Sequence, residues 1–319
     1  MTRKIACLAL LALARPAFAD TVFVSDEQQN VLHVVDGASG RIEGSIAVGA
    51  RPRGMALAPD GKTLYVAAGN ANRIDVIDLA SRKVVRQLDS GTDPERFVVS
   101  PDGRRLYIAN EDHSAVSFLD IASNKALREV TVGPEPEGMA VSPDGALVIA
   151  TSETASTTHF IDTGTGRLLD SVIVGSRPRA ALFIKGGREL WVTSELRGTI
   201  TVFDPATRKI VDRVDLVKLL PGIDPVQAVE MAITRDGRRL FVALGRGNHV
   251  AEIDPATHRL VRTFPVGNRN WGIALSPDDR RLYAVAGLSG DMTVIDLEAN
   301  RVLRTIRLGG MPWGVAAAR

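Results

Sequence analysis

The 319-residue sequence predicts an all-β fold made of seven copies of one repeat, because two separate features recur at the same intervals. An aspartate closes a β-rich run at Asp36, Asp78, Asp120, Asp162, Asp204, Asp254 and Asp296, at intervals of 42 residues apart from one of 50. Pro-Asp-Gly turns at 59–61, 101–103 and 143–145, with degenerate copies at 185–187, 235–237 and 277–279, keep these intervals. Units of about 40–45 residues are typical of four-stranded β-propeller blades. We therefore expect a seven-bladed β-propeller.

Each unit is expected to contain four short strands, A to D, which are clearest in the second unit. Residues 54–58 form strand A and precede the turn at 59–61, where Pro presets one backbone angle and Gly permits another. Residues 64–68, 73–78 and 83–88 form strands B, C and D and are rich in Val, Ile, Leu or Tyr. No segment has a convincing helical period, so we expect almost no helix.

The two ends of the repeat array predict how the ring closes. The first unit begins at residues 22–24, which align with strand B, so it lacks a strand A of its own. Residues 312–316 align with the strand A segment 52–56. The C-terminal strand is therefore expected to complete the N-terminal blade, a 3+1 closure that removes the open edge of that sheet.

Residues 1–19 resemble a secretory signal peptide. Arg3 and Lys4 give a basic start, residues 5–14 are an apolar run too short to span a membrane, and 17–19 form a small-x-small cleavage site. The alternative is a cytosolic chain with an apolar N-terminal helix. We expect a periplasmic or secreted protein whose residues 20–319 form one propeller domain, with an insertion at about 217–228 and no transmembrane segment.

Composition excludes several classes of function. The chain has 39 basic and 37 acidic residues, so its net charge of +2 gives no footprint for nucleic acid. Its one cysteine, Cys7, lies in the predicted signal peptide, which leaves no cysteine for zinc, haem or an iron–sulfur cluster. No hydrolase elbow, zinc-protease motif or phosphate loop is present. We therefore expect no catalytic residues, no cofactor and no metal.

The repeated aspartates and the few histidines do not change this expectation. Seven aspartates around a ring are explained as turn residues whose carboxylates accept backbone N–H groups. His33 and His159 share a register in strand C and are expected to be packing residues. His113 and His249 are expected in B–C loops on one face, where a metal pair without an evident third ligand is the alternative.

The strand B sequences resemble YVTN-type β-propeller repeats. Residues 64–67 (Leu-Tyr-Val-Ala), 106–110 (Leu-Tyr-Ile-Ala-Asn) and 240–243 (Leu-Phe-Val-Ala) follow turns like Ser-Pro-Asp-Gly, and 190–193 (Leu-Trp-Val-Thr) is the nearest variant of the literal motif. The resemblance covers residues 22–317. With the signal peptide, the chain looks most like the exported propeller proteins associated with PQQ-dependent catabolism. The resemblance is specific for the fold, because propellers host enzymes, scaffolds and adhesins alike.

Candidate binding residues lie where the repeats differ. Strand A lines the centre of a propeller, and the position at its mouth is occupied by Arg53, Glu95, Glu137, Arg179, Val229, Trp271 and Trp313. The next position is small in most units, so Arg96 and Glu230 stand out. This polar funnel with an aromatic wall suits a small polar or aromatic ligand, since arginine binds carboxylates and tryptophan stacks. The alternative is that these residues pair with one another in a solvated ring of salt bridges.

The insertion lies between Asp215 and Glu230 and contains the apolar residues Leu219, Leu220 and Ile223. Because D–A connections share the face of the funnel, we expect the insertion to be a lid or a docking patch above it. The alternative is a loop that packs on its own blade.

The leading hypothesis for function is a non-catalytic periplasmic accessory or scaffold protein. It would bind a small molecule or a periplasmic protein partner for PQQ-dependent oxidation of alcohols or aldehydes. One alternative is an enzyme, because seven-bladed propellers include lactonases and heavy subunits of quinoprotein amine dehydrogenases. Glu95, Glu137 or Glu230 would then be the general base, and Arg96 or Arg179 would bind a carboxylate. A second alternative is a cell-surface interaction module like the YVTN surface-layer proteins.

Overall fold

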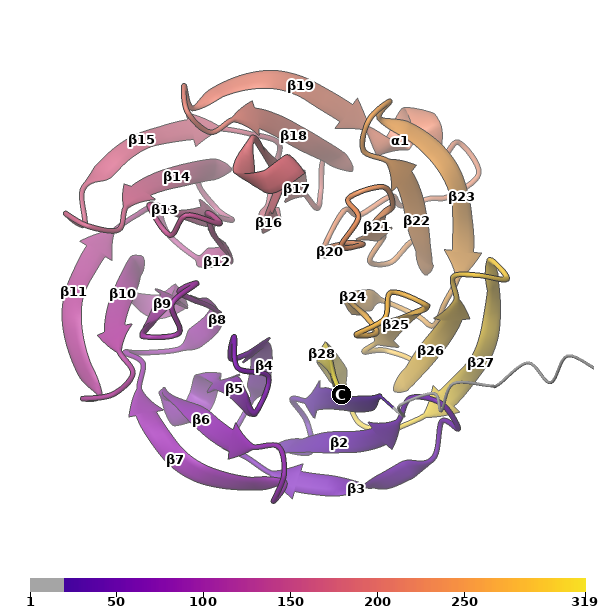
Figure 1. The fold of residues 1–319 in the computed structure, drawn as a ribbon. Helices are drawn as coiled ribbons and strands as arrows, with labels where there is room; N and C mark the ends of the chain where they lie inside the picture. Colours follow the sequence, from indigo (N-terminus) through magenta and orange to yellow (C-terminus); the bar gives the residue numbers. More distant parts are fainter. Residues whose placement is uncertain (1–19) are drawn as a thin grey trace, which may run out of the picture.

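The computed structural model describes residues 20–319 and places them in a ring of seven four-stranded antiparallel sheets (Figure 1). The predicted seven-bladed β-propeller is therefore confirmed. The predicted signal peptide at 1–19 lies outside the described residues. Within the described residues, no helix has the length and apolar character needed to cross a membrane.

The blades are numbered from the N-terminus, and their strands are given from the centre of the ring outward. Blade 1 contains β28 (Pro312–Ala318), β1 (Thr21–Asp26), β2 (Val31–Asp36) and β3 (Ile42–Ala47). Blade 2 contains β4 (Pro52–Leu57), β5 (Thr63–Ala68), β6 (Arg73–Asp78) and β7 (Lys83–Asp89). Blade 3 contains β8 (Pro94–Val99), β9 (Arg105–Asn110), β10 (Ala115–Asp120) and β11 (Lys125–Thr131). Blade 4 contains β12 (Pro136–Val141), β13 (Leu147–Ser152), β14 (Thr157–Asp162) and β15 (Leu168–Ile173).

The remaining blades follow the same order. Blade 5 contains β16 (Pro178–Ile184), β17 (Glu189–Ser194), β18 (Thr199–Asp204) and β19 (Lys209–Asp215). Blade 6 contains β20 (Met231–Ile233), β21 (Leu240–Ala243), β22 (His249–Asp254) and β23 (Arg259–Pro265). Blade 7 contains β24 (Asn270–Leu275), β25 (Arg281–Ala286), β26 (Asp291–Asp296) and β27 (Arg301–Arg307). The helices are the short α1 (Leu216–Leu219) and the 3-10 turns η1 (Gly69–Ala71), η2 (Glu111–His113) and η3 (Lys185–Gly187).

The C-terminal strand closes the ring. β28 pairs antiparallel with β1, so that Ala316 lies opposite Phe23 and Val315 lies opposite Val24. Ala316 also packs with Phe23 in the apolar cluster between blades 1 and 2. The predicted 3+1 closure is therefore confirmed, because a strand from the end of the chain completes the sheet at its beginning.

The apolar core is divided among the junctions between blades. Leu64, Val66 and Ile77 of blade 2 pack with Phe23 and Val34 of blade 1. Equivalent clusters join every following pair of blades around the ring. Each blade therefore buries its apolar faces only against its neighbours, as repeat architectures do.

The repeated aspartates form turns, as the sequence predicts. The hydroxyl and the backbone N–H of Ser81 donate to Asp78 Oδ1 at 2.6 and 2.7 Å. Ser123 donates in the same way to Asp120 at 2.6 and 2.8 Å. These hydrogen bonds hold the pKa of both aspartates below its ordinary value, because they stabilise the ionised form. The aspartates thus fix the C–D turns.

Deleting residues 311–319 should destabilise the whole ring. Blade 1 loses its inner strand, and Trp313, which is 3% exposed, leaves the cluster between blades 6 and 7. The loss of one buried tryptophan side chain alone costs about 3–5 kcal/mol, so the midpoint of thermal unfolding should fall steeply. Deleting only the exposed Arg319 is the control. Equal melting of the truncated and full-length proteins would contradict the closure.

Candidate functional site

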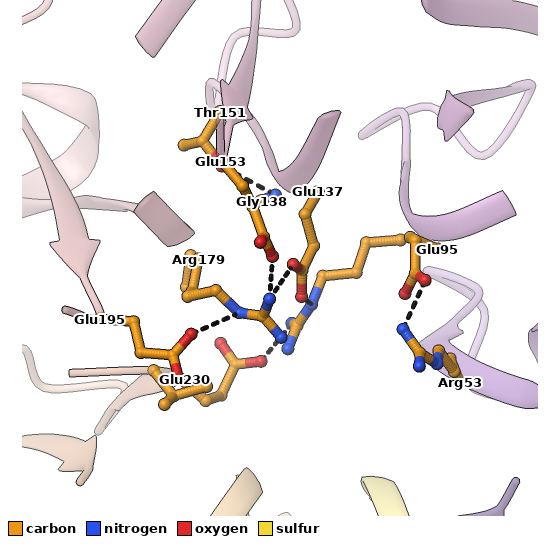
Figure 2. Close-up of polar contacts among 12 residues, drawn as sticks. Arg53, Glu95, Glu137, Gly138, Thr151, Glu153, Arg179, Glu195 and Glu230 are labelled. Carbon is orange, nitrogen blue, oxygen red and sulfur yellow. Dashed lines mark hydrogen bonds and ion pairs between the residues drawn. The ribbon is translucent and has the colours of Figure 1, made fainter. Parts of the chain in front are cut away.

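The mouth of the ring is built by an irregularity that six of the seven inner strands share. In blade 3 the pairing of β8 with β9 shifts register between Pro94 and Phe97, which leaves Glu95 and Arg96 within the shift. Such bulges re-aim side chains and interrupt regular pairing. The two positions that the sequence singles out therefore leave the sheet and converge near the axis of the ring (Figure 2).

Glycine at the second of these positions lets neighbouring inner strands approach. A Cβ atom at Gly138 would lie 2.9 Å from the carbonyl oxygen of Arg179, which is too close for a side chain. In blades 3 and 6 the glycine is replaced by Arg96 and Glu230. Arg96 Nη1 donates to Glu230 Oε2, so these side chains join two blades that lie far apart in the ring.

Two arginines of blade 2 converge on Glu95 of blade 3. Arg53 donates to Glu95 and, through Nε at 2.9 Å, to Glu27 of blade 1. Arg51 also donates to Glu95, and its Nη1 lies 2.6 and 2.8 Å from the two carboxylate oxygens of Asp93. Glu95 is only 1% exposed, so the two guanidinium groups compensate a carboxylate from which water is excluded.

Arg179 of blade 5 lies at the centre of a second group (Figure 2). Its Nη1 lies 2.6 Å from Glu137 and also contacts Glu153, and its Nε lies 3.6 Å from Glu195. Arg179 and these three carboxylates are each no more than 7% exposed. Glu137 Oε1, Arg179 Nε and Glu195 Oε2 have no hydrogen-bond partner among the described residues. One arginine thus faces several carboxylates, which leaves hydrogen-bonding capacity inside the site.

The predicted funnel residues therefore pair with one another, as the alternative interpretation expects, but the pairs are buried rather than solvated. Five of them, Arg53, Glu137, Arg179, Trp271 and Trp313, line a cavity of about 170 Å³. Its lining consists of Glu27, Arg51, Arg53, Glu111, Glu137, Glu153, Arg177, Arg179, Arg269, Trp271 and Trp313. A cavity of charged donors and acceptors is suited to a small polar ligand.

The two tryptophans lie on neighbouring inner strands, β24 and β28, as the sequence predicts. Both rings are nearly buried, and guanidinium groups lie against them. Arg179 and Arg269 are 4.7 and 4.4 Å from the centre of the Trp271 ring, and Arg96 is 4.7 Å from that of Trp313. Cation–π contacts of this kind hold arginines in place. The aromatic wall therefore positions the arginines of the cavity.

The structure brings in residues that comparison of the inner strands alone misses. Four glutamates follow strand B at one repeat position: Glu27, Glu111, Glu153 and Glu195. Three arginines share a position in the D–A loops: Arg51, Arg177 and Arg269. Both sets keep the intervals of the repeat, so the same 42-residue alignment extended to the loops contains the signal for them.

Glu111 has the properties of an acid–base group. It begins η2 directly after β9, and its side chain is 30% exposed. Burial and the neighbouring Glu95 carboxylate raise the pKa of Glu111 to about 8. Burial also opposes ionisation of Glu95, but Arg53 and Arg51 hold the pKa of Glu95 below its ordinary value. Neighbouring carboxyl groups whose pKa values are displaced in opposite directions are typical of acid–base sites.

Asp93, Glu95 and Glu111 have ligand atoms within 4.8 Å of one another, the one such group of three found in residues 20–319. Arg51 donates to Asp93 and Glu95 and lies 3.4 Å from Glu111. The guanidinium group already supplies positive charge to these carboxylates, so a metal ion would have to displace it. The sequence-based expectation of no metal stays a prediction.

The histidines lie outside this carboxylate group. His113 Nε2 is 3.2 Å from the Thr92 hydroxyl, and His249 Nδ1 is 2.7 Å from the Gly247 carbonyl oxygen. His159 is buried, and burial lowers its pKa to about 4, so it packs in the neutral form.

The insertion lies away from the cavity. It begins with α1, which Figure 1 places at the outer edge of the ring near β23. Leu220 is buried in the apolar cluster between blades 5 and 6, and Leu219 and Ile223 pack against the same cluster. Their apolar surface is removed from water there rather than presented above the mouth. We therefore abandon the lid and docking interpretation of this segment.

The opposite face is less uniform than the turn sequences suggest. A hollow of about 670 Å³ lies there between blades 4 and 5, lined in part by Pro143, Leu147, Phe183 and Pro205. Leu147 stands where blade 6 has Arg239, which spans the junction to donate to the Leu297 carbonyl of blade 7. The shorter apolar side chain of Leu147 leaves this space open, so the face with the repeated turns also carries a distinctive hollow.

Comparison with known proteins identifies the fold. No protein-family model and no curated protein matches the sequence. The periplasmic gluconolactonase PpgL of Pseudomonas aeruginosa is similar in structure, with a TM-score of 0.78, 23% identity, and coverage of 94% of this chain and 99% of that one. Kuenenia stuttgartiensis hydrazine synthase has a TM-score of 0.77, 22% identity, and coverage of 86% and 92%. The dihydro-heme d1 dehydrogenase NirN has a TM-score of 0.69, 16% identity, and coverage of 95% and 77%. At these identities the likeness shows the propeller fold.

The leading hypothesis of a non-catalytic accessory or scaffold protein is wrong by this comparison. The solved structures that share the fold include a gluconolactonase, a hydrazine synthase and a dehydrogenase, and nothing in these names points to a non-catalytic scaffold. The opposite pKa displacements of the neighbouring Glu95 and Glu111 are also a feature that the search for linear motifs misses. The enzyme alternative is favoured instead.

The free energy of unfolding should contain a contribution from Glu111 that falls as pH rises from about 4.5 to about 8. Its pKa is about 8 in the folded protein against an ordinary 4.5, so the folded state binds more protons in this window. Urea unfolding across these pH values should show a flatter pH dependence for Glu111→Gln than for the wild type. Glu129→Gln, on the exposed outer strand β11, is the control. Identical slopes for Glu111→Gln and wild type would contradict the raised pKa.

Proposed function

We propose that the protein is a hydrolase that opens the lactone ring of a sugar acid at the mouth of the propeller. The observation that carries this proposal is the Glu95–Glu111 pair, of which Glu111 lines the arginine-rich cavity. Lactone hydrolysis needs a base for water and positive charge for the carbonyl oxygen, and both kinds of group lie here. The fold shared with a gluconolactonase supports the choice of reaction.

Glu111 is the proposed general base. Its pKa of about 8 makes its ionised form a stronger base than an ordinary carboxylate, and its partly exposed side chain meets water in the cavity. Glu111 takes a proton from the water that attacks the lactone carbonyl. It returns that proton to the ring oxygen as the acyl C–O bond breaks, which yields the hydroxy acid.

Arg51 is the proposed stabiliser of the oxyanion. Its Nη2 lies 3.4 Å from Glu111 Oε2, and its side chain is 22% exposed. A fixed guanidinium group beside the base stabilises the negative charge that develops on the carbonyl oxygen. Asp93 holds Arg51 through both carboxylate oxygens, so the cation is oriented before substrate binds.

The predicted channel-mouth residues are the proposed binding surface for the hydroxyl groups of the substrate. A polyhydroxy ring needs acceptors and donors together, and the mouth presents both. The acceptors and donors are Glu95, Glu137, Glu230, Arg53, Arg96 and Arg179, with Trp271 and Trp313 as the apolar wall.

The repeat family, the cellular location and the association with PQQ-dependent catabolism are proposals as well. We infer a YVTN-type propeller from the strand B sequences and a periplasmic location from residues 1–19. The association with PQQ-dependent catabolism rests on the same resemblance. Mass spectrometry of the exported protein would test the location, since an N-terminus at Asp20 supports it and an intact Met1 contradicts it.

The mature protein should hydrolyse D-glucono-1,5-lactone faster than the spontaneous reaction, with a kcat that rises with pH through about 8 as Glu111 ionises. Glu111→Gln should lower kcat by about 10²–10⁴-fold, the range of a lost general base. A pH-stat assay corrected for the spontaneous rate measures both, with Glu129→Gln as the control. If neither this nor any other sugar-acid lactone is hydrolysed by the wild type, the proposed function is wrong.

Besides its place in the proposed binding surface, Glu95 is proposed to influence the reaction through Glu111, as a positioning residue and not as the general base. Glu95→Gln removes the charge that helps to raise the pKa of Glu111, and it frees Arg51 to pair with Glu111. The pH profile of kcat should therefore move to lower pH. Lower activity with an unmoved profile would show that Glu95 only supports the structure of the mouth.

A further inference from the structure

Arg269 differs from the other arginines of the cavity. Arg51, Arg53, Arg96, Arg177 and Arg179 each lie within 4.0 Å of a carboxylate. Among residues 20–319, no carboxylate lies within 4.0 Å of the Arg269 guanidinium group, which lies 4.4 Å from the centre of the Trp271 ring. A cation held on an aromatic face keeps its N–H donors available for an anion.

The backbone holds Arg269 in this place. Its N–H donates to Asn248 Oδ1 at 2.9 Å, and its φ of 60° lies in the left-handed region. The side chain lines the same cavity as Glu111. Glu111 directly follows β9 and Arg269 directly precedes β24. Because β9 and β24 face each other across the ring (Figure 1), the two residues enter the mouth from opposite sides.

A second arginine for which no ion pair is seen among residues 20–319 lies in a loop that is hydrogen-bonded to the start of β24, directly after Arg269. Arg246 lies in the B–C loop of blade 6, directly after Gly245, whose carbonyl accepts the N–H of Asn270 at 3.0 Å. That bond joins the loop of Arg246 to the loop of Arg269. Burial, and then the charge of Arg246, lower the pKa of Arg269, which agrees with two cations close together.

The nearby carboxylates do not neutralise this pair. Glu195 and Glu27 act on Arg269 only through space, and each lies nearer to another arginine. Two guanidinium groups with unused donors form an element that binds carboxylate or phosphate in a forked geometry. The rest of the mouth is rich in carboxylates, so an anionic group binds favourably only on this side.

We propose that Arg269 and Arg246 bind an anionic substituent of the substrate, on the side of the cavity opposite Glu111. This inference rests on the proposed function and narrows its substrate to sugar-acid lactones that carry a second acidic group, a carboxylate or a phosphate. The anion at Arg269 and Arg246 then orients the lactone carbonyl toward Glu111 and Arg51.

The test compares three lactones in the mature protein: neutral D-glucono-1,5-lactone, the carboxylate-bearing D-glucaro-1,4-lactone, and 6-phospho-D-glucono-1,5-lactone. At least one anionic lactone should have a kcat/KM higher than the neutral one by about tenfold or more, and the preferred one identifies the acidic group. Arg269→Gln and Arg246→Gln should remove this preference mainly through KM. The Arg246→Gln variant separates loss of the anion site from misfolding, because Arg246 is exposed and its replacement leaves the contact between Arg269 and Trp271 intact. Arg197→Gln, in the B–C loop of blade 5, is the matched control.

The outcomes separate this inference from the proposed function. Hydrolysis with equal kcat/KM for neutral and anionic lactones, or a preference that survives in both variants, overturns the anion site and leaves the proposed function standing. If no lactone is hydrolysed, the proposed function fails, and thermal shifts with gluconate, glucarate and 6-phosphogluconate test the site alone. A larger shift with glucarate or 6-phosphogluconate than with gluconate, lost in both variants, supports it. Equal shifts for all three overturn it.

Discussion

Charges buried at the mouth of the ring must be neutralised by opposite charges within the protein. The ion pairs that do so connect blades that share no sheet. An unpaired charge removed from water costs several kcal/mol, so each guanidinium group must reach a carboxylate wherever one is available. Arg53 of blade 2 reaches Glu27 of blade 1 and Glu95 of blade 3. Arg96 of blade 3 reaches Glu230 of blade 6. The ion pairs therefore connect neighbouring and distant blades where the inner strands bulge and their ladders are interrupted.

The repeat supplies the backbone of the site, and substitutions on that backbone supply its chemistry. The loop before strand A, the bulge within strand A and the end of strand B each place a position near the axis, so a blade can present up to three side chains there. Blade 2 uses these positions for Arg51 and Arg53, whereas blade 3 uses them for Asp93, Glu95 and Glu111. One geometry thus yields a cationic blade beside an acidic one, which is why Glu95 meets two arginines.

The fold could be predicted almost completely, because turn residues that recur every 42 residues specify both the strands and the closure. The site could be predicted only in part. Inner-strand positions such as Glu95 follow from the alignment of the inner strands. Glu111 keeps the same repeat interval but lies in the loop after strand B, so only an alignment extended to the loops contains it, and the raised pKa of Glu111 depends on neighbours that the sequence does not place. The prediction that Leu220 lies above the mouth is wrong, because Leu220 is buried between blades 5 and 6. An apolar insertion can be accommodated in either place, and only the packing of neighbouring side chains decides which.

The distribution of charge explains why the carboxyl group of Glu111 keeps its proton while the guanidinium group of Arg269 has no carboxylate partner. The mouth holds eight carboxylates, Glu27, Asp93, Glu95, Glu111, Glu137, Glu153, Glu195 and Glu230, and six arginines, Arg51, Arg53, Arg96, Arg177, Arg179 and Arg269. Burial and this excess of negative charge raise the pKa of Glu111 and of Glu137. Arg269 cannot relieve the excess, because its place against Trp271 is on the other side of the ring. A proton-accepting side and a cationic side therefore face each other, and a substrate with an electrophilic carbonyl and a distant anion complements that polarity.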